Sequence, residues 1–419
     1  KATPLDVINE VIEAVTKDKN NILEKTMYDE ARSMAQSLTK VEKDNLLWGI
    51  PFLVKDNIAM KGIETTGSSN ILNGFIPLCN AEVIDKLLAA KAIPVAKTTL
   101  DEFGMGGRGE TGHKGITYNP YGKERTRIVG GSSSGSASGV ASGYVPFAVG
   151  SDTGDSIRKP ASFAGLVGFK PTWGEISRFG LFAFMPTLDH VGFFTRSVSE
   201  ARVLFEKTRG YDKKDATSVM NVPFKTEKDA TLKGKKVAVL EPIFALMKNK
   251  LLIKEFHNLV DKLRQAGAVV DFVPFDKDLL AAIFPTYFIL SCAEANVSNA
   301  CLTGIGFGNK EEGASYEEIV ANTRGKGFSS RIKYRLMLGQ YALKKENRNE
   351  YYDRAQKARR LIVEAVDKVL ENYDVIMLPA APNHAPTVDK QSEPQVKSKI
   401  TIWLLLILVV ILHLPFLTF

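Results

Sequence analysis

Cysteine and histidine are scarce in this chain, which has three cysteines and five histidines among 419 residues. Cys79, Cys292 and Cys301 stand far apart, and no two histidines follow the HxxH or HxxxH spacing of metal ligands. The composition therefore disfavours a disulfide framework and a structural zinc site, and we expect no metal site in the chain. It favours a reducing compartment, which we take to be the cytoplasm.

A large excess of one charge sign is also absent. The chain has 55 Lys and Arg against 47 Asp and Glu, for a net charge of +8. This balance suits an anionic partner, but it is typical of a mixed, solvated surface and does not by itself establish nucleic-acid binding. A secretory signal is not expected either, because residues 1–4 lead directly into an amphipathic helix pattern.

Apolar periodicity predicts an α/β protein without internal repeats. Short apolar runs alternate with helical stretches through the first half of the chain. A polar stretch then leads into a β-α-β unit, expected as a sub-domain on the main sheet, and into a long helix and a strand. The predicted helices are 5–15, 27–38, 81–90, 251–266 and 348–371; the predicted strands are 50–54, 93–96, 145–149, 236–240, 268–273 and 375–378; the polar stretch is 211–236.

Two glycine-rich loops that contain serine point to hydrolytic chemistry. The segments GGSSSGS (130–136) and SDTGDSIRKP (151–160) contain Ser132 and Ser156, and Lys55 follows the apolar run IPFLV far upstream. Serine needs an adjacent base to become a nucleophile, and that base must be neutral near pH 7. A lysine desolvated by apolar neighbours meets this condition, so the three residues predict a Ser-Ser-Lys centre.

Other interpretations of the first loop exist. A Gly-Ser stretch is usually a flexible loop. A phosphate-binding P-loop is disfavoured because no Lys-Ser or Lys-Thr pair follows the glycines. The G-x-S-x-G pattern at 131–135 would make Ser133 a nucleophile of the α/β-hydrolase type, but that arrangement needs an apolar strand before it, and residues 123–127 read KERTR.

The second loop has two interpretations. The proline at position 160 suits the first turn of a helix that begins near Ser156. Such a start leaves backbone N–H groups free to stabilise an oxyanion, and these are the amides of Thr153, Gly154 and Asp155. Alternatively, Ser156 only caps the helix. Lys55 likewise has a simpler interpretation, as a solvated lysine at the end of a strand.

Three segments together resemble the amidase signature family: GIPFLVKDNI (49–58), the GGSSSGS loop and GSDTGDSIRKPASFAGLVGFKPTWG (150–174). Longer segments at 98–111, 177–198 and 335–344 are similar to the branch of this family that forms the A subunits of glutamyl-tRNA(Gln) amidotransferases. The similarity covers the chain from its first residues to about Lys390. It implies the amidase signature fold, a large mixed sheet surrounded by helices, with a smaller inserted β-α-β lobe.

The resemblance also implies roles for single residues. Ser156 would be the acylated nucleophile, Ser132 the bridging serine after a cis peptide bond, and Lys55 the base. Tyr287 and Arg335 match positions that resemble part of a glutamine-binding site, where the fork of an arginine holds the α-carboxylate through two hydrogen bonds. Without the resemblance, Tyr287 is typical of a core aromatic residue and Arg335 of a solvated helix residue.

The function implied is that of a glutaminase subunit, which hydrolyses glutamine and supplies ammonia for the transamidation of Glu-tRNA(Gln) to Gln-tRNA(Gln). The partners implied are the B and C subunits, with tRNA bound mainly through the partner subunit. ATP and magnesium are expected in that partner, and this chain needs no cofactor of its own. Two other hypotheses stay open: a free-standing amidase of small amides, and a catalytically inactive scaffold chain.

The chain departs from the family pattern in places. Asp155 stands where the family usually has a second glycine, and its carboxylate would either raise the pKa of Lys55 or point to solvent. The segment SNACLTGIGFG (298–308) lacks the charged residues common there.

The C-terminal part differs most. The family continues past Lys390 with more sheet and an acidic residue that binds the substrate amino group, whereas residues 400–419 here form an apolar stretch without a formal charge. We therefore expect an amidase domain at 1–390, incomplete relative to the family. Three interpretations of the tail compete, namely a membrane tail anchor, a buried strand pair and a frameshift product. Contact with a membrane stays open.

Overall fold

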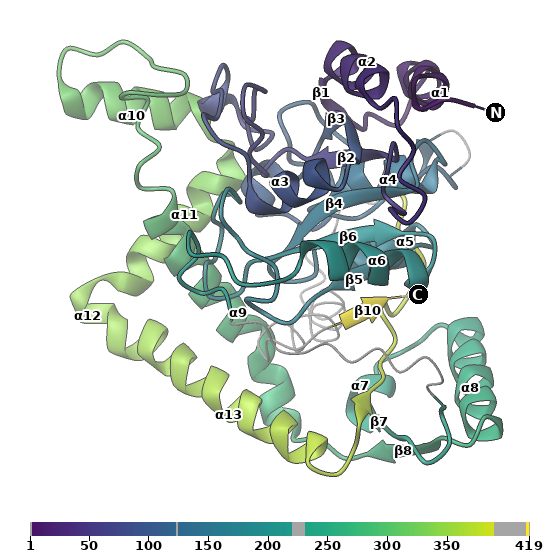
Figure 1. Ribbon diagram of the computed structural model, residues 1–419. Helices are drawn as coiled ribbons and strands as arrows, with labels where there is room; N and C mark the ends of the chain where they lie inside the picture. Colours follow the sequence, from purple (N-terminus) through teal and green to yellow (C-terminus); the bar gives the residue numbers. More distant parts are fainter. Residues whose placement is uncertain (1, 123–124, 220–230, 389–415, 419) are drawn as a thin grey trace.

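A mixed β-sheet forms the centre of the molecule. The computed structural model describes residues 2–122, 125–219, 231–388 and 416–418 (Figure 1). Its seven-stranded sheet has the order β1-β3-β2-β4-β6-β5-β10; β2 runs parallel to β3 and β4, and the other neighbours are antiparallel. The strands are β1 (Leu23–Thr26), β2 (Pro51–Lys55), β3 (Ile93–Thr98), β4 (Phe147–Asp152), β5 (Val167–Lys170), β6 (His190–Thr195) and β10 (Phe416–Thr418). The predicted large mixed sheet is confirmed.

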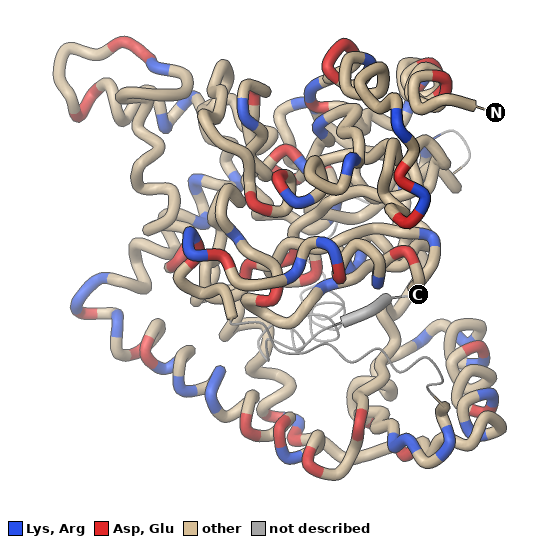
Figure 2. The backbone as a smooth tube through the Cα atoms, viewed as in Figure 1, with Lys and Arg blue, Asp and Glu red and all other residues tan. Residues whose placement is uncertain are grey.

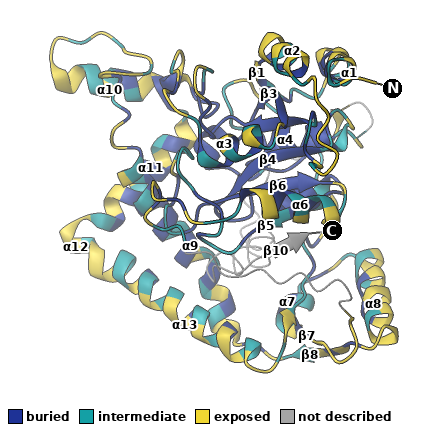
Figure 3. Cartoon of the chain, in the orientation of Figure 1, coloured by how far each residue is buried: buried dark blue, intermediate teal, exposed yellow. Residues whose placement is uncertain are grey.

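Helices cover both faces of this sheet. In β2, Leu53 packs into the core on one face, whereas Phe52 and Val54 pack into the core on the other. A strand buried on both faces reads as a continuous apolar run, which is why this segment is recognisable in the sequence. Figure 3 shows the central strands fully buried beneath helices with exposed outer surfaces. The helices are α1 (Pro4–Thr16), α2 (Tyr28–Ser37), α3 (Glu82–Ala89), α4 (Ser134–Ala141), α5 (Arg158–Phe163) and α6 (Val198–Thr208).

A helical layer lies beside the sheet and packs against loops that connect the strands. Ile283 and Leu290 from α9, Leu336 from α11 and Ile362 from α13 belong to one buried cluster with Phe103 from the sheet side. Helix α9 is long and apolar enough to cross a membrane by length and composition, but half of that stretch is buried within the molecule, as in the core helix of a folded domain. The elements are α9 (Lys277–Ser298), α10 (Tyr316–Gly327), α11 (Ser330–Leu343), α12 (Lys345–Arg348), the π-helical η4 (Asn349–Asp353) and α13 (Arg354–Leu370).

The predicted β-α-β unit is present but does not extend the main sheet. It forms a separate parallel sheet in the order β8-β7-β9, because β9 pairs with the free edge of β7 and contributes a third strand. Val239, Phe256 and Val270 give this lobe a core of its own. Its elements are β7 (Lys236–Leu240), α7 (Glu241–Phe244), α8 (Lys250–Gln265), β8 (Val269–Val273) and β9 (Val375–Ile376).

Two predicted features fall partly or largely outside the described residues. Of the polar stretch 211–236, residues 220–230 are not described. Of the tail 400–419, only 416–418 are described; their backbone forms β10, antiparallel to β5. The domain boundary at 390 and the three interpretations of the tail therefore stay predictions.

Charges of both signs are interspersed over the described surface. Figure 2 shows Lys and Arg alternating with Asp and Glu along α13 and the connecting loops. Some of these charges form exposed ion pairs one helical turn apart, such as Arg360 with Glu364 and Arg202 with Glu206. Exposed pairs of this kind add little to stability. The described surface is thus the mixed, solvated one expected from the composition.

Candidate active site

The carboxyl ends of three parallel strands converge at one edge of the sheet. β2 ends at Lys55, β3 at Thr98 and β4 at Asp152, and β2 is hydrogen-bonded to both of its neighbours. In sheets of this kind, ligands commonly bind beyond the carboxyl ends of the strands. The loop after β4 carries Ser156, and the loop before α4 carries Ser132. The topology therefore brings together three residues that are far apart in the sequence.

Lys55 is completely buried and makes its contacts with hydroxyl and carbonyl groups. Its Nζ lies 2.7 Å from Oγ of Ser132, 2.8 Å from Oγ of Ser151 and 3.4 Å from the carbonyl oxygen of Ser151. The interpretation of Lys55 as a solvated lysine is therefore wrong.

Burial also changes the acid–base character of this lysine. Desolvation lowers the pKa of Lys55 from 10.5 to about 7, because the buried ammonium loses its hydration. Four carboxylates act in the opposite direction and keep the pKa from falling further; they belong to Asp152, Asp101, Asp189 and Asp155. A pKa near 7 leaves a large fraction of neutral amine at physiological pH, as a general base requires.

Ser132 is held by a loop whose backbone approaches Asp101 closely. The peptide bond between Gly131 and Ser132 is cis. The amide of Asp101 donates to the carbonyl oxygen of Ser132 at 3.1 Å, and a Cβ at Gly131 would come within 2.1 Å of the Asp101 carboxylate. Only glycine fits at position 131, so the glycine before the serine is a packing requirement.

Asp101 organises the loop that follows β3. Its carboxylate accepts backbone N–H groups at 2.9 to 3.1 Å from four consecutive residues, 108–111. A carboxylate that collects several N–H donors fixes the loop around itself. Sequence reasoning missed this role, because an aspartate in a polar loop carries no distinguishing pattern.

Ser133 has a structural role and does not have the surroundings of a nucleophile. Its hydroxyl donates to the carbonyl oxygen of Ser151 at 3.0 Å, and its amide donates to the carbonyl oxygen of Ser156 at 3.2 Å. α4 begins at Ser134, directly after it, and 125–130 contains only isolated bridges, without the strand that an α/β-hydrolase elbow needs. The residue thus ties the two serine loops together.

Ser156 lies in a turn before α5 and is 4% exposed. The helix begins at Arg158, two residues later than predicted, with Ile157 as its N-cap and no side-chain capping bond. The reason is Asp152, whose carboxylate accepts the amide of Ile157 at 2.8 Å and binds the Arg158 guanidinium at 2.8 and 3.1 Å. The interpretation of Ser156 as a helix cap is therefore wrong.

The backbone N–H groups expected to stabilise an oxyanion are free to donate hydrogen bonds to a substrate. Within the described part of the chain, the N–H groups of Thr153, Gly154 and Asp155 donate to no acceptor. The carbonyl oxygen of Gly154 accepts a hydrogen bond from the Arg158 guanidinium, which orients this peptide. Free N–H groups beside a candidate nucleophile are the donors that acyl transfer requires.

Tyr287 packs against the site from the helical layer, and the charge of Arg335 acts on Tyr287 from the neighbouring helix α11. A Cβ at Gly154 would come within 2.6 Å of the Tyr287 hydroxyl, so this tyrosine packs directly on the loop that carries Ser156. Arg335 is 8% exposed, with its guanidinium over the rings of Phe184 and Phe288 at 5.7 and 5.1 Å. Its Nη1 is buried and has no hydrogen-bond partner among the described residues. Arg335 is therefore not the solvated helix residue that its sequence context suggests.

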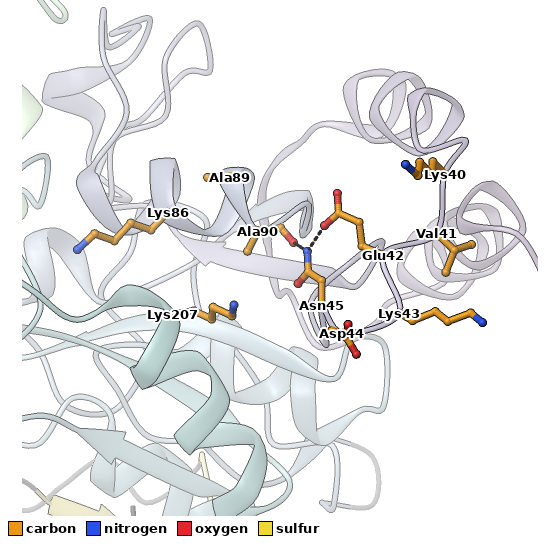
Figure 4. Close-up of a pocket in the computed structure, with 10 residues that line it drawn as sticks. All are labelled: Lys40, Val41, Glu42, Lys43, Asp44, Asn45, Lys86, Ala89, Ala90 and Lys207. Carbon is orange, nitrogen blue, oxygen red and sulfur yellow. Dashed lines mark hydrogen bonds between the residues drawn. The ribbon is translucent and has the colours of Figure 1, made fainter. Parts of the chain in front are cut away.

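A hollow elsewhere on the surface lacks comparable chemistry. It has a volume of about 710 Å³ and is lined by segment 40–45, α3 and α6. Figure 4 shows its lysines pointing in different directions, and Lys86 already donates to the carbonyl oxygens of Thr208 and Arg209. Its lining contains no serine, cysteine or histidine. The described residues also contain no cluster of His, Cys, Asp or Glu suited to a metal ion.

Comparison with known proteins gives these residues a context. The sequence pattern of the family described as Amidase matches residues 6–415 of the chain. The chain belongs to the amidase signature family. The match covers all the residues assembled above and extends past Lys390.

Two of the similar proteins are A subunits of the same enzyme, and a third is an amidase. The A subunit of glutamyl-tRNA(Gln) amidotransferase from Staphylococcus haemolyticus is 38% identical over 396 residues, which cover 91% of this chain and 80% of that protein. The crystal structure of the corresponding A subunit of glutamyl-tRNA(Gln) amidotransferase from Thermotoga maritima matches with a TM-score of 0.78 and 31% identity, covering 99% of this chain and 86% of that one. A crystal structure of an amidase matches with a TM-score of 0.79 and 27% identity, covering 99% and 88%.

Two residues of this amidase that sequence reasoning missed orient Lys55. Oγ of Ser151 accepts hydrogen bonds from Lys55 Nζ at 2.8 Å and from the side-chain amide of Asn57 at 2.9 Å. These two donors occupy both lone pairs of the hydroxyl oxygen. A neutral Lys55 therefore uses its own N–H groups on Ser151 and directs its lone pair at Ser132.

The structure decides between the two interpretations of Asp155, the residue that stands where the family usually has glycine. Its side chain is 1% exposed and forms a buried ion pair with Lys159, one helical turn later. The interpretation that Asp155 points to solvent is wrong. Burial raises the pKa of Asp155, Lys159 opposes that rise, and the Asp155 carboxylate in turn raises the pKa of Lys55.

We expect the acid limb of the pH profile to report the pKa of Lys55. Below about pH 7 the amine is protonated and cannot accept a proton, so kcat/KM for amide hydrolysis should fall about tenfold per pH unit. Above pH 7 the neutral amine predominates and the rate should level off. A profile that is flat from pH 5 to 8, or that rises only near pH 10, would contradict the role of Lys55 as the base.

Lys55→Ala and Ser132→Ala should each reduce turnover by orders of magnitude, and the double variant should lose little more. The two groups are 2.7 Å apart and act as one proton path, and residues that act as a unit are not additive. Steady-state kinetics of the two single variants and the double variant measure this. Losses that multiply would argue against a shared path.

Proposed function

We propose that this chain is the glutamine-hydrolysing subunit of an amidotransferase that converts Glu-tRNA(Gln) to Gln-tRNA(Gln). The observation that carries the chemistry is the buried Lys55 amine at 2.7 Å from Ser132, beside the loop of Ser156. The names of the relatives, which are A subunits of glutamyl-tRNA(Gln) amidotransferases, support the substrate.

The geometry supports an acyl-enzyme mechanism. Lys55 takes the proton of Ser132, Ser132 takes the proton of Ser156, and Oγ of Ser156 attacks the side-chain carboxamide carbon of glutamine. The N–H groups of the 153–155 loop stabilise the oxyanion. When the C–N bond breaks, the proton returns through Ser132 to the leaving nitrogen and ammonia departs. A water molecule, activated by the same path, then hydrolyses the glutamyl ester and restores Ser156.

Arg335 supports recognition of an amino-acid substrate. Its buried Nη1 has no partner among the described residues, and a buried cationic donor left unpaired is costly unless a ligand satisfies it. The α-carboxylate of glutamine is such a ligand, since it accepts two hydrogen bonds from a guanidinium. Tyr287, on α9 of the same helical layer, packs on Gly154 in the acylation loop.

The remaining parts of the overall reaction belong to partners in this proposal. The B and C subunits, with tRNA bound mainly through the partner subunit, would receive the ammonia. ATP and magnesium would act in that partner, and this chain would need no cofactor. The complex would work in the cytoplasm.

The test is ammonia release from glutamine by the chain assembled with B and C subunits and charged Glu-tRNA(Gln), and formation of Gln-tRNA(Gln). Release of ammonia from simple amides by the chain alone, without stimulation by partners or tRNA, would favour a free-standing amidase. Absence of hydrolysis under all of these conditions would favour an inactive scaffold chain.

Ser156→Ala should abolish amide hydrolysis in the assembled complex, because no other group forms the acyl intermediate. The intermediate itself can be trapped with an activated ester and located by peptide mass spectrometry. Recovery of the acyl group on Ser133 would overturn the assignment of the nucleophile.

Arg335→Ala should raise KM for glutamine by roughly 10- to 100-fold with a smaller effect on kcat, since binding of the α-carboxylate is the same in the ground and transition states. Arg331→Ala, an exposed arginine on the same helix, is the matched control and should leave KM unchanged. An unchanged KM in Arg335→Ala would remove this residue from the substrate site.

A further inference from the structure

A buried ion pair stands directly beside the proposed nucleophile. The side chains of Asp155 and Lys159 are 1% and 5% exposed, and Nζ of Lys159 donates to Oδ2 of Asp155. The backbone of the two residues is also joined, because the amide of Lys159 donates to the carbonyl oxygen of Asp155 at 3.0 Å. The pair therefore spans the turn that contains Ser156 and the first turn of α5.

This pair lies within electrostatic reach of Lys55. Ser156, the next residue after Asp155, accepts the amide of Ser133 at 3.2 Å, and the adjacent Ser132 contacts Lys55 at 2.7 Å. The Asp155 carboxylate is one of the charges that raise the pKa of Lys55. The chain thus carries an extra anion at a position where the resemblance implies glycine.

The other carboxylates that face Lys55 have compensating partners of their own. Asp152 binds the guanidinium of Arg158, and Asp101 accepts the backbone N–H groups of residues 108–111. Asp189 accepts the amides of Phe184 and Met185 together with the hydroxyl of Thr153. For Asp155, the compensating partner is Lys159.

An uncompensated carboxylate at position 155 would work against catalysis. In a buried site, an anion stabilises a nearby ammonium ion, and the interaction is strong because water does not screen it. Lys55 would then keep its proton at neutral pH and stop accepting one from Ser132. A cation paired with the anion weakens this effect.

We propose that Lys159 is a charge-balancing residue for the active site, which offsets the anion introduced by Asp155 and so keeps Lys55 available as the base. This inference rests on the proposed Ser-Ser-Lys mechanism. It makes Asp155 and Lys159 a matched pair, so that the loss of either residue alone disturbs Lys55 more than the loss of both. Neither residue needs to touch the substrate.

The test measures the titration of Lys55 directly. Lysine labelled with ¹³C at Cε is incorporated, the signal of Lys55 is identified by its loss in Lys55→Met, and its midpoint is followed by NMR from pH 5 to 10. The variants are Lys159→Gln, Asp155→Asn and the double variant. Lys17→Gln is the matched control, because it removes an exposed Lys–Glu pair with the same one-turn spacing.

The proposal predicts the direction in which the titration midpoint of Lys55 shifts in each variant. Lys159→Gln leaves the anion without this cation and should raise the Lys55 midpoint by about one pH unit, and Asp155→Asn removes the anion and should lower it by a similar amount. The double variant should titrate closer to the parent protein than either single variant, and Lys17→Gln should titrate like the parent protein. The acid limb of kcat/KM should move with the midpoint in each case. Midpoints that stay in place in both single variants, or that fail to recover in the double variant, would overturn the proposal.

The readouts separate this inference from the proposed function. If no form of the protein releases ammonia from glutamine but the Lys55 midpoints shift as stated, the proposed function fails and the charge balance stands. If the parent protein is active and the midpoints do not move, the charge balance fails alone. If Lys159→Gln does not fold, Asp155→Asn and the double variant still test the proposal. The proposal requires that the Lys55 midpoint is lowered in Asp155→Asn and that it moves back toward the parent value in the double variant.

Discussion

The desolvation of Lys55 is the constraint on which the site depends. An exposed lysine keeps its proton far above neutral pH, and only the removal of water brings the pKa of Lys55 to about 7. Burial of this kind needs a strand covered on both faces, and β2 meets that need because β3 and β4 flank it and helices pack above and below. The central position of β2 is thus part of the catalytic chemistry as well as of the fold.

A desolvated amine next to several carboxylates is stable only if each carboxylate is satisfied. Burial would raise the pKa of Asp152, but the Arg158 guanidinium holds it well below its ordinary value. Asp101 collects backbone N–H groups from a single loop, and Asp189 does the same for Phe184 and Met185. Because the partners are mostly backbone amides, the electrostatics of the site also fix the conformations of the loops around it.

Much of this architecture can be predicted from the sequence. The features that cannot be predicted have physical causes that a local sequence pattern does not record. Continuous apolar runs mark the buried strands, and glycine-rich loops mark the serines. Ser151 and Asn57 escaped notice because their partners lie 94 to 96 residues away in the chain, and no local pattern records such contacts. The late start of α5 follows from the ion pair of Asp152 with Arg158, which competes with helix geometry.

Burial of polar residues was the least predictable property. Arg335 sits on a helix whose sequence suggests exposure, and only the packing of α11 against α9 and against the segment before β6 places it over the rings of Phe288 and Phe184. The separate sheet of the small lobe is similar, because β9 comes from beyond α13, more than a hundred residues after β7. Both features depend on long-range packing, which periodicity does not encode.

The residues proposed for the chemistry and those proposed for substrate recognition belong to different layers of the molecule. Lys55, Ser132 and Ser156 belong to strands and loops of the sheet, whereas Tyr287 and Arg335 belong to helices that cover one edge of it. The hydrogen bonds of the Lys55 amine with Ser132 and Ser151 are made within the sheet layer, so side chains of the helical layer can change without removing any of them. In the proposed mechanism, the base and the side chains that bind the substrate can therefore vary independently of each other.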